Sequence, residues 1–199
     1  MAGTRGKLVA IEGIDQAGKK TQSRLLARSL GEEGYRGSIW EFPDYTTPLG
    51  RQLKAYLAGK NRLDLRAVHL LYAANRWEVA KELDQKLQNG TNIIVNRYWP
   101  SNLAYGIAHG LSADWLSCLD RGLPKPSLVI VLDISPITSL KRKTVGRDVH
   151  ESDLAYLKKV RAAYVRLARR YNWKLVDGEQ DSRTIQTELH AKVTFALKH

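Results

Sequence analysis

A glycine-rich segment near the N-terminus has the residue types and spacing of a phosphate-binding loop. It reads Gly13-Ile14-Asp15-Gln16-Ala17-Gly18-Lys19-Lys20-Thr21, which satisfies the pattern G-x-x-x-x-G-K. The two glycines let successive backbone N–H groups point at phosphate oxygens, and a helix that follows presents its positive N-terminus to the same anion. Lys19 can then reach the outer phosphates, where charge must be stabilised during transfer. The segment therefore predicts a binding site for a nucleoside triphosphate.

The residue after Lys19 departs from this pattern. It is normally Ser or Thr, whose hydroxyl ligates the Mg²⁺ carried by the triphosphate, and here it is Lys20. Thr21 comes one residue late, so on a helix its side chain points about 100° away. Either Thr21 substitutes through a shifted turn, or the metal is held mainly by phosphate and water. We expect Mg²⁺ to arrive with ATP and assign it no definite protein ligand.

Alternating strands and helices are expected to position this loop. Apolar, β-branched runs predict five strands, at residues 7–11, 38–42, 92–95, 127–133 and 174–176. Helical patterns cover residues 21–30, 50–57, 65–89, 102–109, 113–119, 153–171 and the chain from about 183. Gly31 and Gly34 are expected to end the first of these helices. Strands that are apolar on both faces indicate a parallel sheet covered on two sides. The predicted fold class is α/β, doubly wound, with about five strands, and one domain over residues 1–199.

Composition narrows the classes of partner and compartment. Lys and Arg outnumber Asp and Glu by 32 to 20, a net charge of +12, so phosphate-bearing molecules should be attracted. No nucleic-acid motif accompanies the charge, which argues against a nucleic-acid partner. No apolar run approaches the ~20 residues that cross a bilayer. The single cysteine, Cys118, cannot form an internal disulfide and is interpreted as a small buried apolar residue. We expect a cytoplasmic protein.

Several short motifs occur in a fixed order from the loop onward. Together they resemble the pattern of the thymidylate kinase (dTMP kinase) family. The set comprises Glu12-Gly13-x-Asp15, Phe42-Pro43, Ala74-Asn75-Arg76-Trp77-Glu78, Arg97-Tyr98, Ser101-Asn102 with Ala104-Tyr105, and Gly122-Leu123-Pro124-Lys125-Pro126. The resemblance runs from about residue 7 to residue 177. It implies a P-loop kinase fold, a homodimer, and transfer of the γ-phosphoryl group of ATP to dTMP, which gives dTDP for thymidine triphosphate synthesis.

The resemblance implies roles around the acceptor nucleotide. Tyr72 would stack on the thymine ring and Arg76 would hydrogen-bond it, and their spacing of four puts them on one helix face. Phe42 would line the same pocket. Asp15 would contact the sugar 3′-hydroxyl, and Tyr105 would pack against the sugar and disfavour a 2′-hydroxyl. Ser101 belongs to the same substrate-binding set.

Three positions are expected near the transferred phosphoryl group. Arg97 agrees with the family pattern, whereas Asn96 and Tyr45 depart from it. Arg97 follows a predicted parallel strand, where ligands gather in open α/β sheets, and in the family it grips the phosphates. The preceding residue is usually Asp and is here Asn96. Tyr45 stands where the family usually has a second phosphate-clamping Arg, and a phenol donates only one hydrogen bond.

A basic segment near residues 139–151 corresponds to the family's mobile lid. Such a lid closes over the triphosphate and excludes water. Some family members keep an Arg inside the phosphate loop, at the position of Gln16, so Arg142 and Arg147 are expected to supply the charge instead. With Lys19 and Arg97, these two arginines complete the predicted catalytic set.

Two alternatives stay open at this point. The acceptor could be another nucleoside monophosphate, which Tyr45 would permit. Alternatively, the chain could be a catalytically weakened nucleotide-binding paralogue, because Lys20, Tyr45 and Asn96 are all altered. The five histidines show no metal-ligand spacing, and none is assigned a catalytic role.

Overall fold

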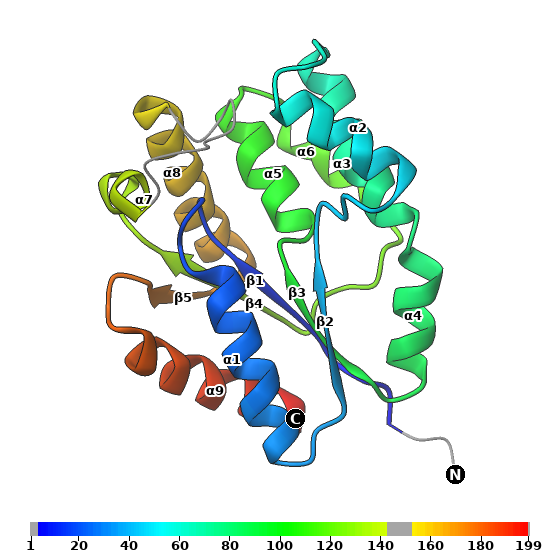
Figure 1. Ribbon diagram of the computed structural model, residues 1–199, viewed down its shortest axis with the longest axis vertical. Helices are drawn as coiled ribbons and strands as arrows, with labels where there is room; N and C mark the ends of the chain where they lie inside the picture. Colours follow the sequence, from blue (N-terminus) through cyan, green and yellow to red (C-terminus); the bar gives the residue numbers. More distant parts are fainter. Residues whose placement is uncertain (1–3, 143–152, 199) are drawn as a thin grey trace.

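A five-stranded parallel sheet forms the centre of the computed structural model, which describes residues 4–142 and 153–198 (Figure 1). Its order is β2-β3-β1-β4-β5, and every neighbouring pair is parallel. The strands are β1 (Leu8–Glu12), β2 (Gly37–Glu41), β3 (Asn92–Asn96), β4 (Leu128–Asp133) and β5 (Lys174–Asp177). All five lie where the apolar runs predicted them, and the α/β prediction is confirmed.

Helices cover both faces of the sheet (Figure 1). On one face α1 packs against α9, and on the other α5 packs against α8 while α4 lies over β3. The remaining helices surround the carboxyl end of the strands. The helices are α1 (Lys19–Glu32), α2 (Pro48–Leu57), α3 (Leu65–Trp77), α4 (Ala80–Gln88), α5 (Trp99–Ala108), α6 (Ala113–Leu119), α7 (Pro136–Arg142), α8 (Leu154–Tyr171) and α9 (Ser182–Lys198).

The core lies between these layers. All five residues of β1 are buried, as are the central residues of β3 and β4, whereas the edge strand β2 is only partly covered. Burial on both faces explains why the central strands are continuously apolar instead of alternating. The carboxyl ends of β1 and β3 therefore come from a rigid interior, and they carry the loop of residues 13–21 and Arg97.

The prediction of one helix over residues 65–89 is wrong. The chain leaves α3 at Trp77 and enters α4 at Ala80, with Val79 outside helical geometry at φ −115° and ψ 4°. Contacts with other elements fix the break, because the Trp77 indole donates to the Leu119 carbonyl of α6 at 2.9 Å and the Leu49 N–H of α2 donates to Glu78 at 3.4 Å. These tertiary contacts outweigh the local helical pattern.

Two smaller expectations also fail. Cys118 is exposed, because α6 buries Leu116 and a residue two positions further on points to the other side of a helix. Gly31 does not end α1 but lies within it, and Gly34, at φ +85°, follows the helix. No helix was predicted over Pro136–Arg142, where α7 forms and overlaps the start of the basic segment.

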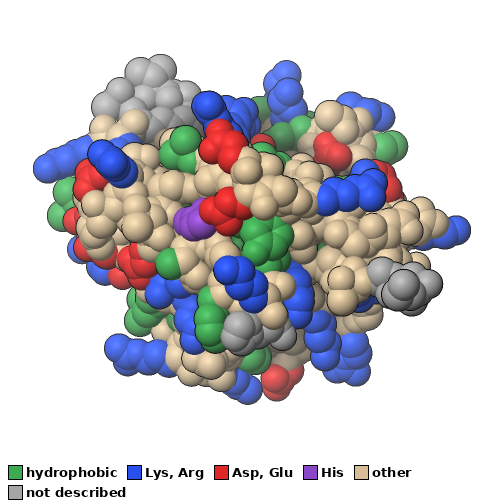
Figure 2. All heavy atoms as spheres, turned by 90° about the horizontal axis from the view of Figure 1, so that it is seen from below, with side chains coloured by type: hydrophobic (Ala, Val, Ile, Leu, Met, Phe, Trp, Pro, Cys, Tyr) green, Lys and Arg blue, Asp and Glu red, His purple; other side chains and the backbone are tan. Residues whose placement is uncertain are grey.

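One face of the molecule shows how its charged side chains are distributed. Figure 2 shows the face seen from below in Figure 1, on which Lys and Arg side chains are interspersed with Asp and Glu instead of forming one stripe. Among the residues described, no helix combines the length and apolar character needed to cross a membrane.

Candidate active site

The connection from β1 to α1 has the geometry of a phosphate-binding loop. Gly13 and Gly18 adopt φ values of +136° and +89°, and a Cβ at Gly13 would lie 2.5 Å from the Leu132 carbonyl oxygen. Both positions therefore require glycine. Lys19 begins α1 and is buried, and its ammonium donates to the carbonyls of Gly13 at 3.1 Å and Ile14 at 2.7 Å. The Lys19 side chain thus lies against the loop in which the phosphates are expected to bind.

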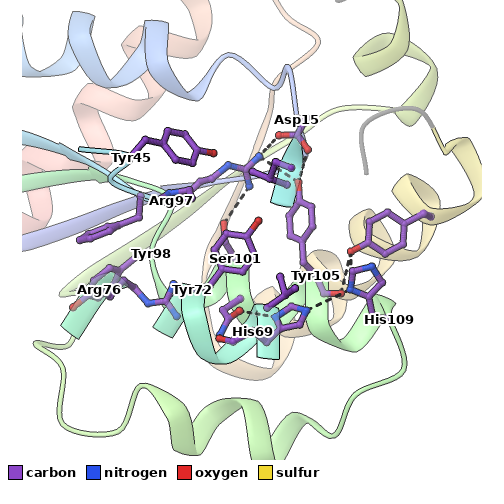
Figure 3. Close-up of a pocket in the computed structure, with 16 residues that line it drawn as sticks. Asp15, Tyr45, His69, Tyr72, Arg76, Arg97, Tyr98, Ser101, Tyr105 and His109 are labelled. Atoms are coloured by element: carbon purple, nitrogen blue, oxygen red, sulfur yellow. Dashed lines mark hydrogen bonds and ion pairs between the residues drawn. The ribbon is translucent and has the colours of Figure 1, made fainter. Parts of the chain in front are cut away.

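A cavity of about 700 Å³, including solvent at its mouth, adjoins this loop (Figure 3). It is formed by residues of α3, α5 and α8 together with the segment after β2. All eight residues that the sequence assigned to the acceptor contribute to its lining: Asp15, Phe42, Tyr45, Tyr72, Arg76, Arg97, Ser101 and Tyr105. Residues separated by up to 90 positions in the chain therefore meet around one space.

Arg97 links the loop to the cavity. It follows β3 in the left-handed region, at φ +62°, and its backbone N–H donates to the Ile11 carbonyl at 3.1 Å. Its guanidinium forms an ion pair with Asp15 and donates to the hydroxyls of Ser101 and Tyr105, each at 3.2 Å. Tyr105 in turn donates to Asp15 at 2.8 Å (Figure 3). The left-handed backbone conformation of Arg97 thus directs its guanidinium to the place where the phosphate-binding loop meets the cavity.

The charges of this cluster are mutually stabilised. Burial alone would raise the pKa of Asp15, but the positive charges of Arg97 and Lys19 and the hydrogen bond from Tyr105 outweigh it and hold that pKa below its usual value. Burial by itself would lower the pKa of Arg97. The charge of Asp15, together with Tyr105, Tyr164 and Glu12, outweighs burial, so the pKa of Arg97 is raised above its usual value. Burial also raises the pKa of Tyr105. At neutral pH the cluster contains one carboxylate, one guanidinium and one neutral phenol.

A second carboxylate, Glu12, contacts the residues that hold this cluster, and the sequence analysis assigned it no role. It is fully buried at the end of β1 and accepts hydrogen bonds from the Tyr98 N–H at 2.7 Å, Ser101 at 2.6 Å and Tyr164 at 2.9 Å. Burial raises its pKa despite these donors. The signal available in the sequence was an acidic residue directly after a fully apolar strand. Glu12 fixes the start of α5 and hence Ser101.

Arg76 is held by a partner that the sequence did not reveal. Its Nε and Nη2 donate to the two carboxylate oxygens of Asp120, each at 2.8 Å, and the two side chains are 3% and 6% exposed. The acidic residues closer in the sequence, Glu78 and Glu82, are not the partners in this pair, since Glu78 accepts from Asn75 and Glu82 pairs with Lys86. A bidentate pair fixes the plane of the guanidinium, so Asp120 orients Arg76 on the cavity wall.

Two of the altered positions, Lys20 and Asn96, meet at Glu41, at the carboxyl ends of β2 and β3. Lys20 forms an ion pair with Glu41 at 3.1 Å, and the Asn96 amide donates to the same carboxylate at 3.1 Å. Tyr45 is 40% exposed at the cavity. Thr21 is exposed on α1, and the described residues contain no group of three or more His, Cys, Asp or Glu able to hold a metal ion. These side chains do not fit direct ligation of Mg²⁺, which prefers several oxygen ligands.

One of the two predicted lid arginines can be placed. Arg142 ends α7 and donates to the Gln16 carbonyl at 3.1 Å and to the Gly178 carbonyl at 3.0 Å. It therefore joins the phosphate loop to the connection between β5 and α9. Arg147 lies outside the described residues, as does most of the predicted lid segment.

Comparison with known proteins gives one consistent family. The family model described as thymidylate kinase matches residues 11–189. Thymidylate kinase of Danio rerio is 37% identical over 196 residues, which is 97% of this chain and 90% of that protein. The Homo sapiens thymidylate kinase is 35% identical and is covered to 94% by the whole of this chain. The solved structure of Candida albicans thymidylate kinase aligns with a TM-score of 0.86 at 30% identity, covering 96% of this chain and 92% of that one.

Proposed function

The chain belongs to the thymidylate kinase family, and from that premise we propose how its residues move the γ-phosphoryl group of ATP to thymidylate (dTMP). The chain is a nucleoside monophosphate kinase that makes dTDP from dTMP, and its fold is of the P-loop kinase type. One observation carries the assignment of residues. Eight side chains expected at the acceptor line a single cavity, and Arg97 connects that cavity to the phosphate loop.

The donor, ATP, binds with its phosphates in the loop of residues 13–21. The backbone N–H groups of the loop and the N-terminus of α1 surround the anion, and Lys19 leaves the carbonyls of Gly13 and Ile14 to contact the outer phosphates. Arg142 already contacts the loop and therefore adds positive charge near the donor. Arg147 belongs to the same proposed lid, at residues 139–151 of a single domain.

The acceptor, dTMP, occupies the cavity. Its base stacks on Tyr72 and receives hydrogen bonds from Arg76, whose orientation Asp120 fixes. The sugar lies near Asp15 and Tyr105, since a carboxylate would repel the phosphate but accepts a hydrogen bond from the 3′-hydroxyl. The remaining residues complete the surroundings: Phe42 packs beside the base, Tyr45 lies at the mouth, and Ser101 holds Arg97.

The chemical step is a direct displacement. An oxygen of the dTMP phosphate attacks the γ-phosphorus of ATP in line, the bond from that phosphorus to the β–γ bridging oxygen breaks, and ADP leaves with the electron pair. The protein supplies position and positive charge, chiefly through Lys19 and Arg97, without a covalent intermediate.

Kinases of this type use ATP with Mg²⁺, which neutralises charge on the phosphates. Because Lys20 and the exposed Thr21 do not provide a ligand set, we propose that Mg²⁺ enters with ATP and is held by phosphate and water.

An acceptor panel tests this function. ADP release from ATP and Mg²⁺ should be measured with dTMP, dUMP, dCMP, dAMP and dGMP, beside a Lys19→Ala variant shown to be folded by circular dichroism. Release should be fastest with dTMP and should fall to background in the variant. Faster release with another monophosphate would identify that monophosphate as the preferred acceptor, and the reaction would still be phosphoryl transfer to a nucleoside monophosphate. No release with any acceptor would leave a nucleotide-binding paralogue.

Tyr105→Phe tests the placement of the sugar. The substitution removes the hydrogen bond to Asp15 and the one accepted from Arg97 while keeping the ring. Loss of a hydrogen bond to a charged group costs about 1.5–3 kcal/mol, so kcat/KM for dTMP should fall by roughly 10- to 100-fold. Tyr171→Phe, at an exposed tyrosine of α8, is the matched control and should leave kcat/KM unchanged. Equal activity of Tyr105→Phe and wild type would remove Tyr105 from the site.

We also propose a cytoplasmic homodimer that associates through α3. Leu70 and Trp77 are 48% and 43% exposed and lie seven residues apart, which places them on one face of that helix. Leu70→Glu should therefore shift the sedimentation coefficient from dimer to monomer. Phe195→Glu on α9, at a residue that is 64% exposed, should leave it unchanged. A wild type that sediments as a monomer at micromolar concentration would contradict the proposal.

A further inference from the structure

Three polar side chains are joined beside the phosphate loop. The Lys20 ammonium lies 3.1 Å from one oxygen of Glu41, and the Asn96 amide donates to the other oxygen at 3.1 Å. Glu41 thus joins two positions at which the sequence departs from the usual P-loop kinase pattern, Ser or Thr at position 20 and Asp at position 96.

The backbone fixes where this cluster lies. Glu41 ends β2 and Asn96 ends β3, and the two residues are directly paired in the sheet. Asn96 also pairs with Ile11 of β1, two residues before the phosphate loop begins. Lys20 immediately follows Lys19 in the first turn of α1. The Lys20 side chain therefore leaves the backbone at the position from which a hydroxyl normally reaches the metal of the bound triphosphate.

The charges indicate that Lys20 has a role beyond packing. A cation in the first turn of a helix is unfavourable next to the positive end of the macrodipole, and α1 has no acidic residue in that turn. Glu41 supplies the counter-charge from a different element. The two side chains are 58% and 48% exposed, so their pairing is weak in water and opens readily. The Asn96 amide oxygen is buried with no hydrogen-bond partner among the described residues, so the cluster is not closed.

We propose that Lys20 is a built-in counter-cation for the triphosphate and that Glu41 holds it ready in the nucleotide-free protein. The inference rests on the proposed function, since it requires ATP phosphates in the loop. When they bind, the Lys20 ammonium exchanges the single carboxylate of Glu41 for the more highly charged phosphates. Binding of ATP by this chain consequently depends less on Mg²⁺ than it would with a hydroxyl at position 20.

The test compares two substitutions with opposite expected signs. The dissociation constant of ATP should be measured by isothermal titration calorimetry, once with excess Mg²⁺ and once with EDTA. Lys20→Ser should weaken binding in EDTA by about tenfold, the value of one charge-assisted hydrogen bond, and should weaken it less with Mg²⁺. Glu41→Gln should strengthen binding in EDTA by about threefold, because the ammonium then has no competing carboxylate. General damage to the fold would weaken binding in both variants.

Matched controls come from the other ion pair of α1. Arg28 and Glu32 are exposed and paired at 3.0 Å, and both lie at least two turns further along the helix. Arg28→Ser and Glu32→Gln change the net charge equally and should alter the ATP dissociation constant less than about twofold.

The outcomes separate the two proposals. If the wild type binds ATP and Lys20→Ser shows the same ratio of dissociation constants with and without Mg²⁺, the role of Lys20 is overturned while the proposed function stands. If the folded wild type binds ATP in neither condition, the donor site of the proposed function fails, and this inference fails with it.

Discussion

Arg97→Ala is expected to lower kcat for dTMP phosphorylation by about 10³-fold, the lower end of the range for arginines that neutralise a transferring phosphoryl group. Arg97 is the residue that connects both sites, since its guanidinium reaches the phosphate loop and the acceptor cavity. Its positive φ and its bonds to Asp15, Ser101 and Tyr105 hold it in place before any substrate binds. The loss should therefore appear in kcat at saturating dTMP and ATP.

Arg97→Lys distinguishes loss of charge from loss of geometry. An ammonium keeps the charge beside Asp15 but cannot reproduce the planar fork, so it should recover only part of kcat. Arg5→Ala is the matched control, because Arg5 also pairs with an aspartate, Asp84, but lies outside the cavity lining. It should retain kcat within about twofold. Arg97→Ala with wild-type kcat would show that the phosphoryl group is transferred elsewhere.

The same variant has a pH signature. In the wild type the pKa of Asp15 is lower in the folded state than in the unfolded state. Its ionised form therefore stabilises the fold at pH values above the unfolded-state pKa, and this stability is lost as the pH falls through the folded-state pKa. Without Arg97, two of the influences that lower the pKa of Asp15 are lost, so this pKa rises relative to the wild type and the variant is less penalised where Asp15 is protonated. The deficit in melting temperature of Arg97→Ala should thus be larger at pH 7 than at pH 4. A deficit independent of pH would mean that Asp15 is not the group left uncompensated.

Asp120→Asn is expected to impair dTMP recognition although Asp120 is not among the cavity-lining residues. Its two carboxylate oxygens each accept a hydrogen bond from Arg76, and both side chains are almost fully buried. An amide can accept only through one oxygen, so the guanidinium loses its fixed plane. We expect kcat/KM for dTMP to fall by about 10- to 100-fold, corresponding to roughly 1.5–3 kcal/mol.

The discrimination between bases separates a positioning role from a structural one. Loss of orientation at Arg76 should reduce the preference for dTMP over dCMP, whereas simple destabilisation would lower both rates equally. Breaking a buried pair also costs about 3–5 kcal/mol of folding stability, so assays belong well below the melting temperature of the variant. Asp114→Asn, at an exposed residue of α6, is the control and should change neither rate nor preference. An unchanged preference in Asp120→Asn would remove Arg76 from base recognition.

Local sequence patterns were sufficient for the five strands and for the phosphate-binding loop. The five strands are short apolar runs whose type follows from composition, and the loop is contiguous, so its glycines and Lys19 are read together. The acceptor residues came from the family resemblance, and the structure brings all of them to one cavity. Their roles remain proposals to be tested by the substitutions above.

What the sequence could not give depends on contacts between distant residues. Asp120 lies 44 positions from Arg76, and nothing local distinguishes it from Glu78 or Glu82 as a partner. Glu12 receives donors from residues 86 to 152 positions away, so its supporting role follows only from the assembled sheet and helices. The break between α3 and α4 likewise depends on Trp77 meeting α6.

The most direct test of the account follows the phosphoryl group itself. ATP labelled on its γ-phosphate should be incubated with Mg²⁺, dTMP and the wild-type protein, and the nucleotides separated by ion-exchange chromatography. The account predicts that label moves from ATP into dTDP in proportion to the ADP formed, and that Lys19→Ala abolishes the transfer. Label that appears only as inorganic phosphate, or that stays in ATP while dTMP is unchanged, would contradict the assignment of phosphoryl transfer to this site.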